Sequence, residues 1–244
     1  MAKASAELVA GAGSHLERYA SLFPCVEINS SFYRSHQRAT YERWAKVTPR
    51  EFRFALKVPR QITHEGGLCA PARPLRQFLD ETSGLGVKRG PLLVQLPPSH
   101  QFDARVVGRF LAALRQQFAG VVVCEPRHSS WFTAPVDRLL ADHEVARVAA
   151  HPGVVTASGV PGGWVGFAYV RLHGWPRVYW SKYSPESIRA LATTLIGVRA
   201  RQAWCIFDNT GSGAAFGNAA ELQRIVKSTC DKGCSAPCRL WQTP

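Results

Sequence analysis

The chain has 244 residues, 46% of them hydrophobic and 19% charged, with a formal net charge of +13 and a pI near 9.9. This composition predicts a globular domain and excludes a disordered chain. Seven cysteines are few for this length, which excludes a disulfide scaffold, and no apolar run approaches roughly 20 residues, which excludes a membrane protein. The positive charge is typical of proteins that bind nucleic acid or phosphorylated ligands. A GC-rich gene would also encode many arginines, and arginines scattered through the predicted helices would give the same net charge without any role in binding. We expect a cytoplasmic protein, because Met1 to Ala10 make a poor signal peptide.

Short apolar runs alternate along the chain with amphipathic segments that carry helix start signals. The first helix is expected at Ser14 to Leu22, after only a weak run at Glu7 to Ala10. Later helices are expected after their capping residues, which are Thr40, Asp103 and Ser184 (followed by Pro185 and Glu186), and near Asn218. The strands are expected in seven apolar runs: Pro24 to Asn29, Phe52 to Val58, Leu92 to Leu96, Val121 to Glu125, Val145 to Ala150, Gly166 to Leu172 and Ala203 to Asp208.

Strands that alternate with helices indicate βαβ units and a parallel sheet. No G-x-G-x-x-G turn follows a strand and there is no P-loop, so we predict no nucleotide cofactor motif and a TIM-type (β/α) barrel rather than a Rossmann sheet. The barrel would have seven clear strands, with the first strand lacking or shortened. Residues 1–228 would form this single domain, and residues 229–244 a tail whose cysteines, Cys230, Cys234 and Cys238, do not have a usual zinc spacing.

Polar residues recur where the predicted strands end, which in a β/α barrel is the functional face. Burying them there costs free energy unless they are paired, so their repetition predicts one polar site. The candidate catalytic residues are Glu27, Lys57, Glu125, His128, His173 and Asp208. The candidate ligand-binding residues are Asn29, Tyr33, His64, Gln95, Arg127, Trp131, Arg171, Tyr183, Asn209 and Asn218.

These residue types limit the chemistry of the site. Its carboxylates could act as acid, base or metal ligands, its histidines could transfer protons, and its cationic side chains could hold an anion. The aromatic residues Tyr33, Trp131, Trp175 and Tyr183 could stack on a base or sugar, or simply pack at the barrel rim. Lys57 could also form a purely structural ion pair with Glu27 or Glu125. No serine-nucleophile elbow and no H-E-x-x-H motif is present.

Several of these segments resemble the YecE-like family (domain of unknown function 72). The resemblance extends from about Leu16 to Val226. The segments are VEINSSFY at 26–33, FALKVPR at 54–60 with ITH at 62–64, LVQLPPS at 93–99, EPRHSSW at 125–131, YVRLHG at 169–174, and FDN at 207–209 with Asn218-Ala. The resemblance implies a TIM-type barrel with a polar cleft and no established activity. By analogy alone, it relates the chain to divalent-metal barrel enzymes such as AP-endonuclease and sugar-isomerase types.

The sequence departs from the family pattern in two places. The usual first strand with a Gly-Thr-Ser-Gly-Trp-type segment is absent, and Asp208 stands where relatives commonly carry Asn, which makes a metal more plausible. The leading hypothesis is an enzyme acting on a small phosphate-bearing or other anionic ligand, with metal-assisted phosphodiester hydrolysis as its sharpest form. The alternatives are a non-catalytic protein that binds nucleic acid or a small anion, and a degraded paralogue that lacks its first strand. The sequence does not determine the metal or the oligomeric state.

Overall fold

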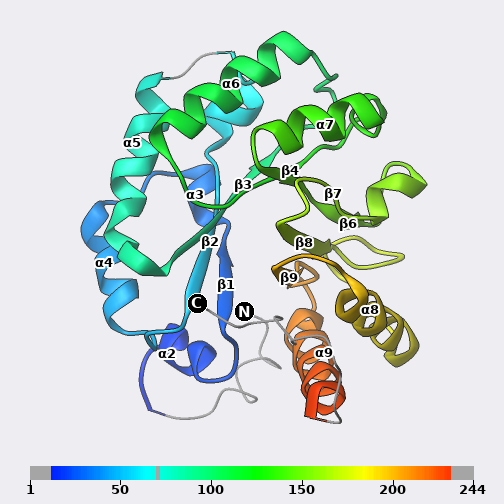
Figure 1. The fold of residues 1–244 in the computed structure, drawn as a ribbon. Helices are drawn as coiled ribbons and strands as arrows, with labels where there is room; N and C mark the ends of the chain where they lie inside the picture. The colour runs from blue at the N-terminus through cyan, green and yellow to red at the C-terminus, as the bar shows by residue number, and fades with distance from the viewer. Residues whose placement is uncertain (1–11, 70–71, 232–244) are drawn as a thin grey trace. The chain divides into compact units, whose positions relative to one another are not determined.

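The computed structural model describes residues 12–69 and 72–231 and shows two compact units, each with its own sheet and core (Figure 1). The N-terminal unit comprises residues 13–147 together with 162–164. The described part of the C-terminal unit comprises mainly residues 148–161 and 165–231. The expected weak run at Glu7 to Ala10, and with it the first strand, lies outside the described residues.

The N-terminal unit is built on a six-stranded sheet in the order β1-β2-β3-β4-β5-β7, parallel except for β7. Its strands are β1 (Cys25–Ile28), β2 (Arg53–Lys57), β3 (Arg89–Gln95), β4 (Val122–Glu125), β5 (Val145–Arg147) and β7 (Gly162–Gly163). Its α-helices are α2 (His15–Ala20), α3 (Ser30–Tyr33), α4 (Arg38–Lys46), α5 (Ala72–Thr82), α6 (Ala104–Gln117) and α7 (Ala134–Asp142). Its shorter helical turns are Gln61–Glu65, Ser83–Lys88 and Ser129–Trp131.

The C-terminal unit contains a three-stranded parallel sheet in the order β6-β8-β9. Its strands are β6 (Ala149–His151), β8 (Phe167–Leu172) and β9 (Gln202–Phe207). Its helices are α8 (Pro185–Gly197), α9 (Ala214–Asp231) and the 3-10 turn Thr156–Gly159. Helices α8 and α9 pack their apolar sides onto this sheet through residues such as Ile188 and Leu222.

Local signals explain where the helices start. Asp103 accepts hydrogen bonds from the backbone of Arg105 and Val106 and so begins α6, as predicted. Ser184 caps α8, with Pro185 as the first helical residue. Helix α4, by contrast, begins at Arg38 rather than after Thr40, because Gln37 already has the extended backbone of a capping residue.

The strands were located well, but their assembly differs from the prediction in two respects. The run Val145 to Ala150 is not one strand: it divides at Val148 into β5 and β6, which belong to different sheets. The Gly-rich stretch after it supplies β7, a short antiparallel strand that the sequence did not predict, and Gly163 there has a φ of 66° that glycine adopts readily.

A mixed α/β fold with parallel strands is therefore confirmed, whereas a closed TIM-type barrel is not. The described strands form two separate hydrogen-bonded sheets, and no ladder within the described ranges joins them into a ring. Helix α9 begins at Ala214, four residues before the predicted start, and extends three residues past the predicted domain end at residue 228. The extent of the single domain remains a prediction, and Cys234 and Cys238 of the expected tail lie outside the described residues.

Candidate functional site

The strand register of the N-terminal unit places four of the predicted residues on one face of the sheet. Glu27 pairs with Ala55, two residues before Lys57; Lys57 pairs with Leu93, two residues before Gln95; and Gln95 pairs with Glu125. Because side chains alternate along a strand, these four side chains lie on the same face at the carboxyl ends of β1 to β4. The side chains of Lys57, Gln95 and Glu125 are buried, and that of Glu27 is partly buried.

Lys57 is held against an aromatic ring. Its Nζ lies 4.0 Å from the centre of the Phe32 ring, an arrangement in which the ring's negative face stabilises the ammonium. The turn α3 that carries Phe32 is fixed to β2, because the Ser31 hydroxyl donates to the Lys57 carbonyl at 2.8 Å. The packing of the turn α3 against β2 thus sets the position of the lysine ammonium group.

Glu125 orients the neighbouring Arg127. The Glu125 side chain is only 1% exposed, and its Oε1 accepts from Arg127 Nε at 3.1 Å and lies 3.0 Å from Nη2. Two contacts to one carboxylate fix the plane of the guanidinium, whose side chain is still 25% exposed. Arg127 is therefore a preoriented cation at the edge of this cluster.

His64 is surrounded by positive groups. Burial lowers the pKa of its imidazole, and Lys57, Arg60, Arg127 and His100 lower this pKa further. The His64 Nδ1 lies 2.9 Å from the Thr63 hydroxyl, and its ring meets the Phe32 ring edge-on. The Phe32 ring thus contacts both Lys57 and His64, and the lowered pKa favours a neutral imidazole near pH 7. We call Lys57, His64, Glu125 and Arg127 the strand-end cluster.

The other predicted residues of this unit have varied surroundings. Asn29 precedes α3 without a side-chain capping bond, and Tyr33 is 72% exposed. The Nδ1 of His128 accepts from the Ser130 amide and so caps a 3-10 turn. Trp131 is fully buried, and its indole donates to the His100 carbonyl at 2.9 Å. Trp131 therefore packs inside this unit, and its role as a ligand-binding residue stays a prediction.

The C-terminal unit contains a second polar group at the ends of β8 and β9. Arg171 is 1% exposed and its Nη2 donates to Asp208 Oδ2 at 3.0 Å, while His173 Nδ1 lies 3.2 Å from the same oxygen. In the register of β8 and β9, Arg171 pairs with Ile206, so Asp208 and His173 continue the face that carries Arg171. A single carboxylate thus joins an arginine and a histidine from the adjacent strand.

Tyr183, Asn209 and Asn218 form a buried hydrogen-bonded clamp. The Asn218 Oδ1 accepts from the Tyr183 amide at 3.2 Å and from Asn209 Nδ2 at 3.0 Å, and the Asn218 Nδ2 donates to the Tyr183 carbonyl at 3.1 Å. The Tyr183 hydroxyl accepts from the Gly174 amide at 3.0 Å, and burial raises the pKa of this phenol to about 12. Asn218 is completely buried and has protein partners for both ends of its amide. These contacts describe a structural clamp, and the assignment of Asn218 as a ligand-binding residue stays a prediction.

The donor groups do not fit a metal ion in the part of the chain that the structure describes. No three His, Cys, Asp or Glu side chains among residues 12–69 and 72–231 come together as a metal site. Of the three predicted acids at strand ends, Glu27, Glu125 and Asp208, the last two each interact with an arginine. Also among these residues, no helix has the length and apolar character needed to cross a bilayer.

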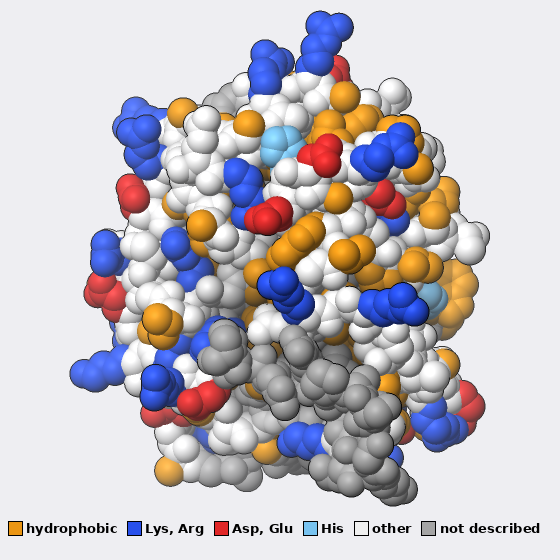
Figure 2. Space-filling view, viewed as in Figure 1, with side chains coloured by type: hydrophobic (Ala, Val, Ile, Leu, Met, Phe, Trp, Pro, Cys, Tyr) orange, Lys and Arg blue, Asp and Glu red, His pale blue; other side chains and the backbone are white. Residues whose placement is uncertain are grey.

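The basic residues do not gather into one stripe on the face shown in Figure 2. Lysine and arginine side chains are scattered over this face among acidic and apolar ones. On this face the basic side chains therefore form no single patch that would attract a polyanion.

A family model described as "Protein of unknown function DUF72" matches residues 7–239. The chain belongs to the DUF72 family. This confirms the resemblance that its strand-end motifs indicated.

Two curated relatives are similar to part of the chain. The UPF0759 protein YecE of Escherichia coli (strain K12) is 33% identical over 120 residues, which are 48% of this chain and 43% of that protein. The UPF0759 protein YunF of Bacillus subtilis (strain 168) is 32% identical over 130 residues, 49% of this chain and 45% of that protein. The matched segments span less than half the length of either relative.

Two solved structures share the fold. A DUF72 family protein from Enterococcus faecalis V583 has a TM-score of 0.76 at 22% identity, over 87% of this chain and 93% of that chain. A DUF72 family protein from Thermotoga maritima MSB8 has a TM-score of 0.72 at 24% identity, over 86% of this chain and 87% of that chain. At these identities the likeness establishes the mixed α/β fold of the DUF72 structures.

Sequence reasoning missed several residues around the predicted ones. Phe32 positions Lys57, and His100 and Arg60 contribute to the electrostatics of His64. His151, whose Nδ1 lies 2.9 Å from the Tyr183 hydroxyl, would have been found if the predicted strand had ended one residue later. Phe32 had no such signal, because a single aromatic residue in a short turn looks like ordinary core.

Proposed function

We propose that the strand-end cluster of the N-terminal unit binds a small phosphate-bearing or other anionic ligand and acts on it. The supporting observation is the convergence of Lys57 and the preoriented Arg127 around a neutral His64. Arg127 offers N–H donors in a plane that suits phosphate or carboxylate, and Lys57 adds a point charge. An imidazole that is neutral near pH 7 is suited to proton transfer with such a ligand.

The chemical roles follow from these environments. Glu125 keeps the Arg127 fork in place, which makes Glu125 a positioning residue, whereas Arg127 and Lys57 would contact the ligand. A bound anion would favour the imidazolium form of His64 and raise its pKa toward the ordinary value, so ligand binding would take up a proton. No step is assigned to a metal, since the donor set described above does not fit one.

We expect sulfate, whose charge is constant in this range, to bind more tightly at about pH 5.5 than at about pH 7.5. The reason is that the lowered His64 pKa leaves the ring uncharged at the higher pH, and protonation at the lower pH adds a positive charge beside the anion. His64→Gln should remove this pH dependence. Arg127→Gln should weaken binding by about tenfold or more at both pH values. Isothermal titration calorimetry measures both effects.

Arg38→Gln is the matched control, because Arg38 also pairs with a glutamate, Glu42, but on the exposed surface of α4. It should leave sulfate affinity unchanged. Equal losses in the Arg38 and Arg127 variants would mean that general surface charge holds the anion, and the proposal would be wrong. The hydrolytic form has its own test with bis(p-nitrophenyl) phosphate: unchanged turnover in both Arg127→Gln and His64→Gln would exclude it.

A second candidate function, binding of single-stranded nucleic acid without catalysis, is favoured by the loop 174–182 of the C-terminal unit. Three large aromatic side chains are exposed in this loop: Trp175 (59%), Tyr179 (45%) and Trp180 (47%). The Arg177 guanidinium lies 4.6 Å from the centre of the Trp180 ring. Exposed aromatic rings next to cationic groups are what base stacking along a single strand requires.

Trp180→Ala should weaken binding of a labelled oligothymidylate by roughly fivefold to 100-fold, because a stacked base contributes about 1–3 kcal/mol. Fluorescence anisotropy measures the affinity, and Val165→Ala, which removes another exposed apolar side chain of this unit, serves as control. Affinity should fall steeply between about 50 and 200 mM salt. Binding that is independent of salt would exclude nucleic acid as the ligand of this loop.

A further inference from the structure

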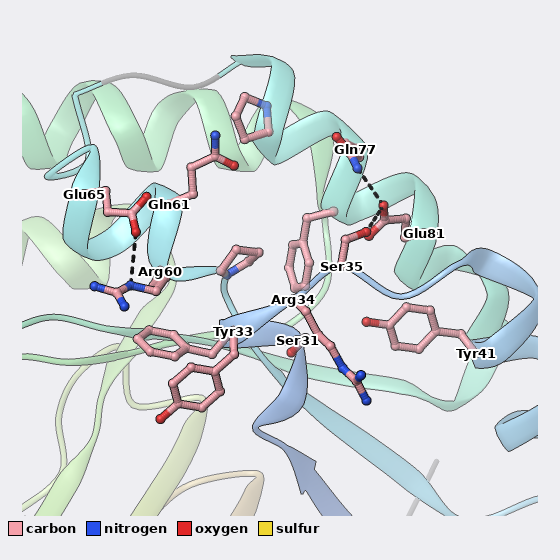
Figure 3. A pocket seen from close by; sticks show the side chains of 14 residues that line it. Ser31, Tyr33, Arg34, Ser35, Tyr41, Arg60, Gln61, Glu65, Gln77 and Glu81 are labelled. Atoms are coloured by element: carbon pink, nitrogen blue, oxygen red, sulfur yellow. Dashed lines mark hydrogen bonds and ion pairs between the residues drawn. The ribbon is translucent and has the colours of Figure 1, made fainter.

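The N-terminal unit contains a pocket of about 250 Å³ that the strand-end cluster does not use. It lies at the carboxyl ends of β1 and β2, between the turn α3, the start of the turn Gln61–Glu65 and the inner side of α5 (Figure 3). Phe32 belongs to its wall and also carries the Lys57 ammonium. A pocket of this size holds one small ring with its substituents and is smaller than the usual drug-sized site.

A buried hydroxyl without a protein partner points into this pocket. Tyr41 has no exposed surface, and its Oη forms no hydrogen bond with any described residue. The ring is fixed by edge contacts with His36 and Trp44, and Figure 3 shows its hydroxyl directed toward the other labelled residues. Burial and the nearby Glu81 raise the pKa of this phenol, so it stays protonated. A buried hydroxyl is costly to leave unpaired, so a ligand oxygen that moved aside the side chains covering the Tyr41 Oη would satisfy it.

The charges around the pocket are balanced. Arg34 and Arg60 contribute two positive groups, and Glu65 and Glu81 contribute two negative groups. The Arg60 Nε lies 3.1 Å from the Glu65 Oε1, so these two charges neutralise each other. The lining therefore gives no net attraction for an anion, in contrast to the strand-end cluster.

The remaining polar groups can both donate and accept hydrogen bonds. Glu81 Oε1 accepts from the Ser35 hydroxyl at 2.5 Å and from Gln77 Nε2 at 2.8 Å, so its carboxylate is held rigidly at the wall. The side-chain amides of Gln61 and Gln77 and the hydroxyl of Tyr41 are further groups that can both donate and accept hydrogen bonds. Groups that combine donors and acceptors suit hydroxyl groups, because each hydroxyl is itself both a donor and an acceptor.

The apolar part of the lining consists mostly of aromatic faces. Tyr33 is largely exposed beside the pocket, and its ring meets that of Phe32 edge-on with centres 4.9 Å apart. Phe78 closes another side. Such rings pack well against the C–H face of a saturated ring.

We propose that this pocket binds the ring of a monosaccharide, with the Tyr41 hydroxyl and the Glu81 carboxylate contacting sugar hydroxyls and Tyr33 covering the ring. Size, balanced charge, mixed donors and acceptors, and aromatic walls together specify a neutral polyhydroxylated ligand. The site is separate from the anion-binding function proposed above, so either can fail without the other.

Ligand-observed NMR with D-glucose and D-ribose at millimolar concentrations tests the proposal. Wild-type protein should show saturation transfer to at least one of these sugars. Tyr41→Phe, which removes a single oxygen atom, should weaken this binding by about tenfold, as should Tyr33→Ala on the exposed wall. The melting temperature of Tyr41→Phe should stay the same or rise, because the lost hydroxyl has no protein partner.

Tyr19→Phe is the matched control. The Tyr19 hydroxyl donates to the Cys25 carbonyl at 3.2 Å within the same unit and does not line the pocket, so its loss should leave sugar binding unchanged and lower the melting temperature. Binding of acetate or glycine but of neither sugar would overturn the proposal. So would the absence of any sugar signal, or equal losses of sugar affinity in the Tyr41 and Tyr19 variants.

Discussion

Replacing Asp208 with alanine should destabilise the protein by about 3 kcal/mol, because it breaks a buried ion pair. Arg171 is almost completely buried, and its Nη2 donates to Asp208 at 3.0 Å. His173, also buried, lies 3.2 Å from the same carboxylate oxygen. The variant removes the negative charge between two basic groups while they stay in a low-dielectric environment, which is costlier than losing an exposed pair. Urea unfolding followed by circular dichroism measures the loss.

Glu186→Ala is the matched control for this prediction. In the same unit, the Glu186 Oε1 lies 2.7 Å from the Arg189 Nη2, but both side chains are exposed. Solvent screens such exposed pairs strongly. Its loss should cost less than about 1 kcal/mol. Asp208→Asn, which keeps an oxygen acceptor, should fall between the two. If Asp208→Ala were as stable as the wild type, the Arg171–Asp208–His173 group would not contribute to the fold.

Asn218→Ala should also cost about 3 kcal/mol of folding free energy, although the residue carries no charge. The variant leaves three buried polar groups without their partner: the Tyr183 amide, the Tyr183 carbonyl and Asn209 Nδ2. Each unsatisfied buried group typically costs about 1–3 kcal/mol, partly offset where a second partner remains. The expected effect corresponds to a melting temperature lower by roughly 10 °C.

Arg224→Ala on the exposed side of the same helix provides the comparison, and it should change stability by less than about 0.5 kcal/mol. The outcome separates two roles for Asn218. A ligand-binding residue would lose affinity and keep its stability, whereas a structural clamp loses stability before any ligand is added. Wild-type stability in Asn218→Ala would contradict the clamp and favour the assignment of Asn218 as a ligand-binding residue.

Secondary structure was predictable where local signals agree with the final fold. The runs that became β2, β3, β4, β8 and β9 are continuous in apolar residues, because strands of parallel sheets are buried on both faces. The start of α6 followed from Asp103, and that of α8 from Ser184 and Pro185, because these residues satisfy the first backbone amides locally. The division at Val148 had no such signal, since the chain is equally apolar on both sides and only sheet pairing separates β5 from β6.

The sequence by itself determined the mixed α/β class, the family and the polar residues at strand ends, because periodicity, capping and motif order are local properties. Only the tertiary structure decided which partners those residues have. It paired Glu125 with Arg127, joined Arg171 and His173 through Asp208, and directed Asn218 to Tyr183, 35 residues away. It also buried Trp131 and aimed the Tyr41 hydroxyl into a pocket. Partners and burial depend on contacts between segments far apart in the chain, and one sequence carries no direct record of those contacts.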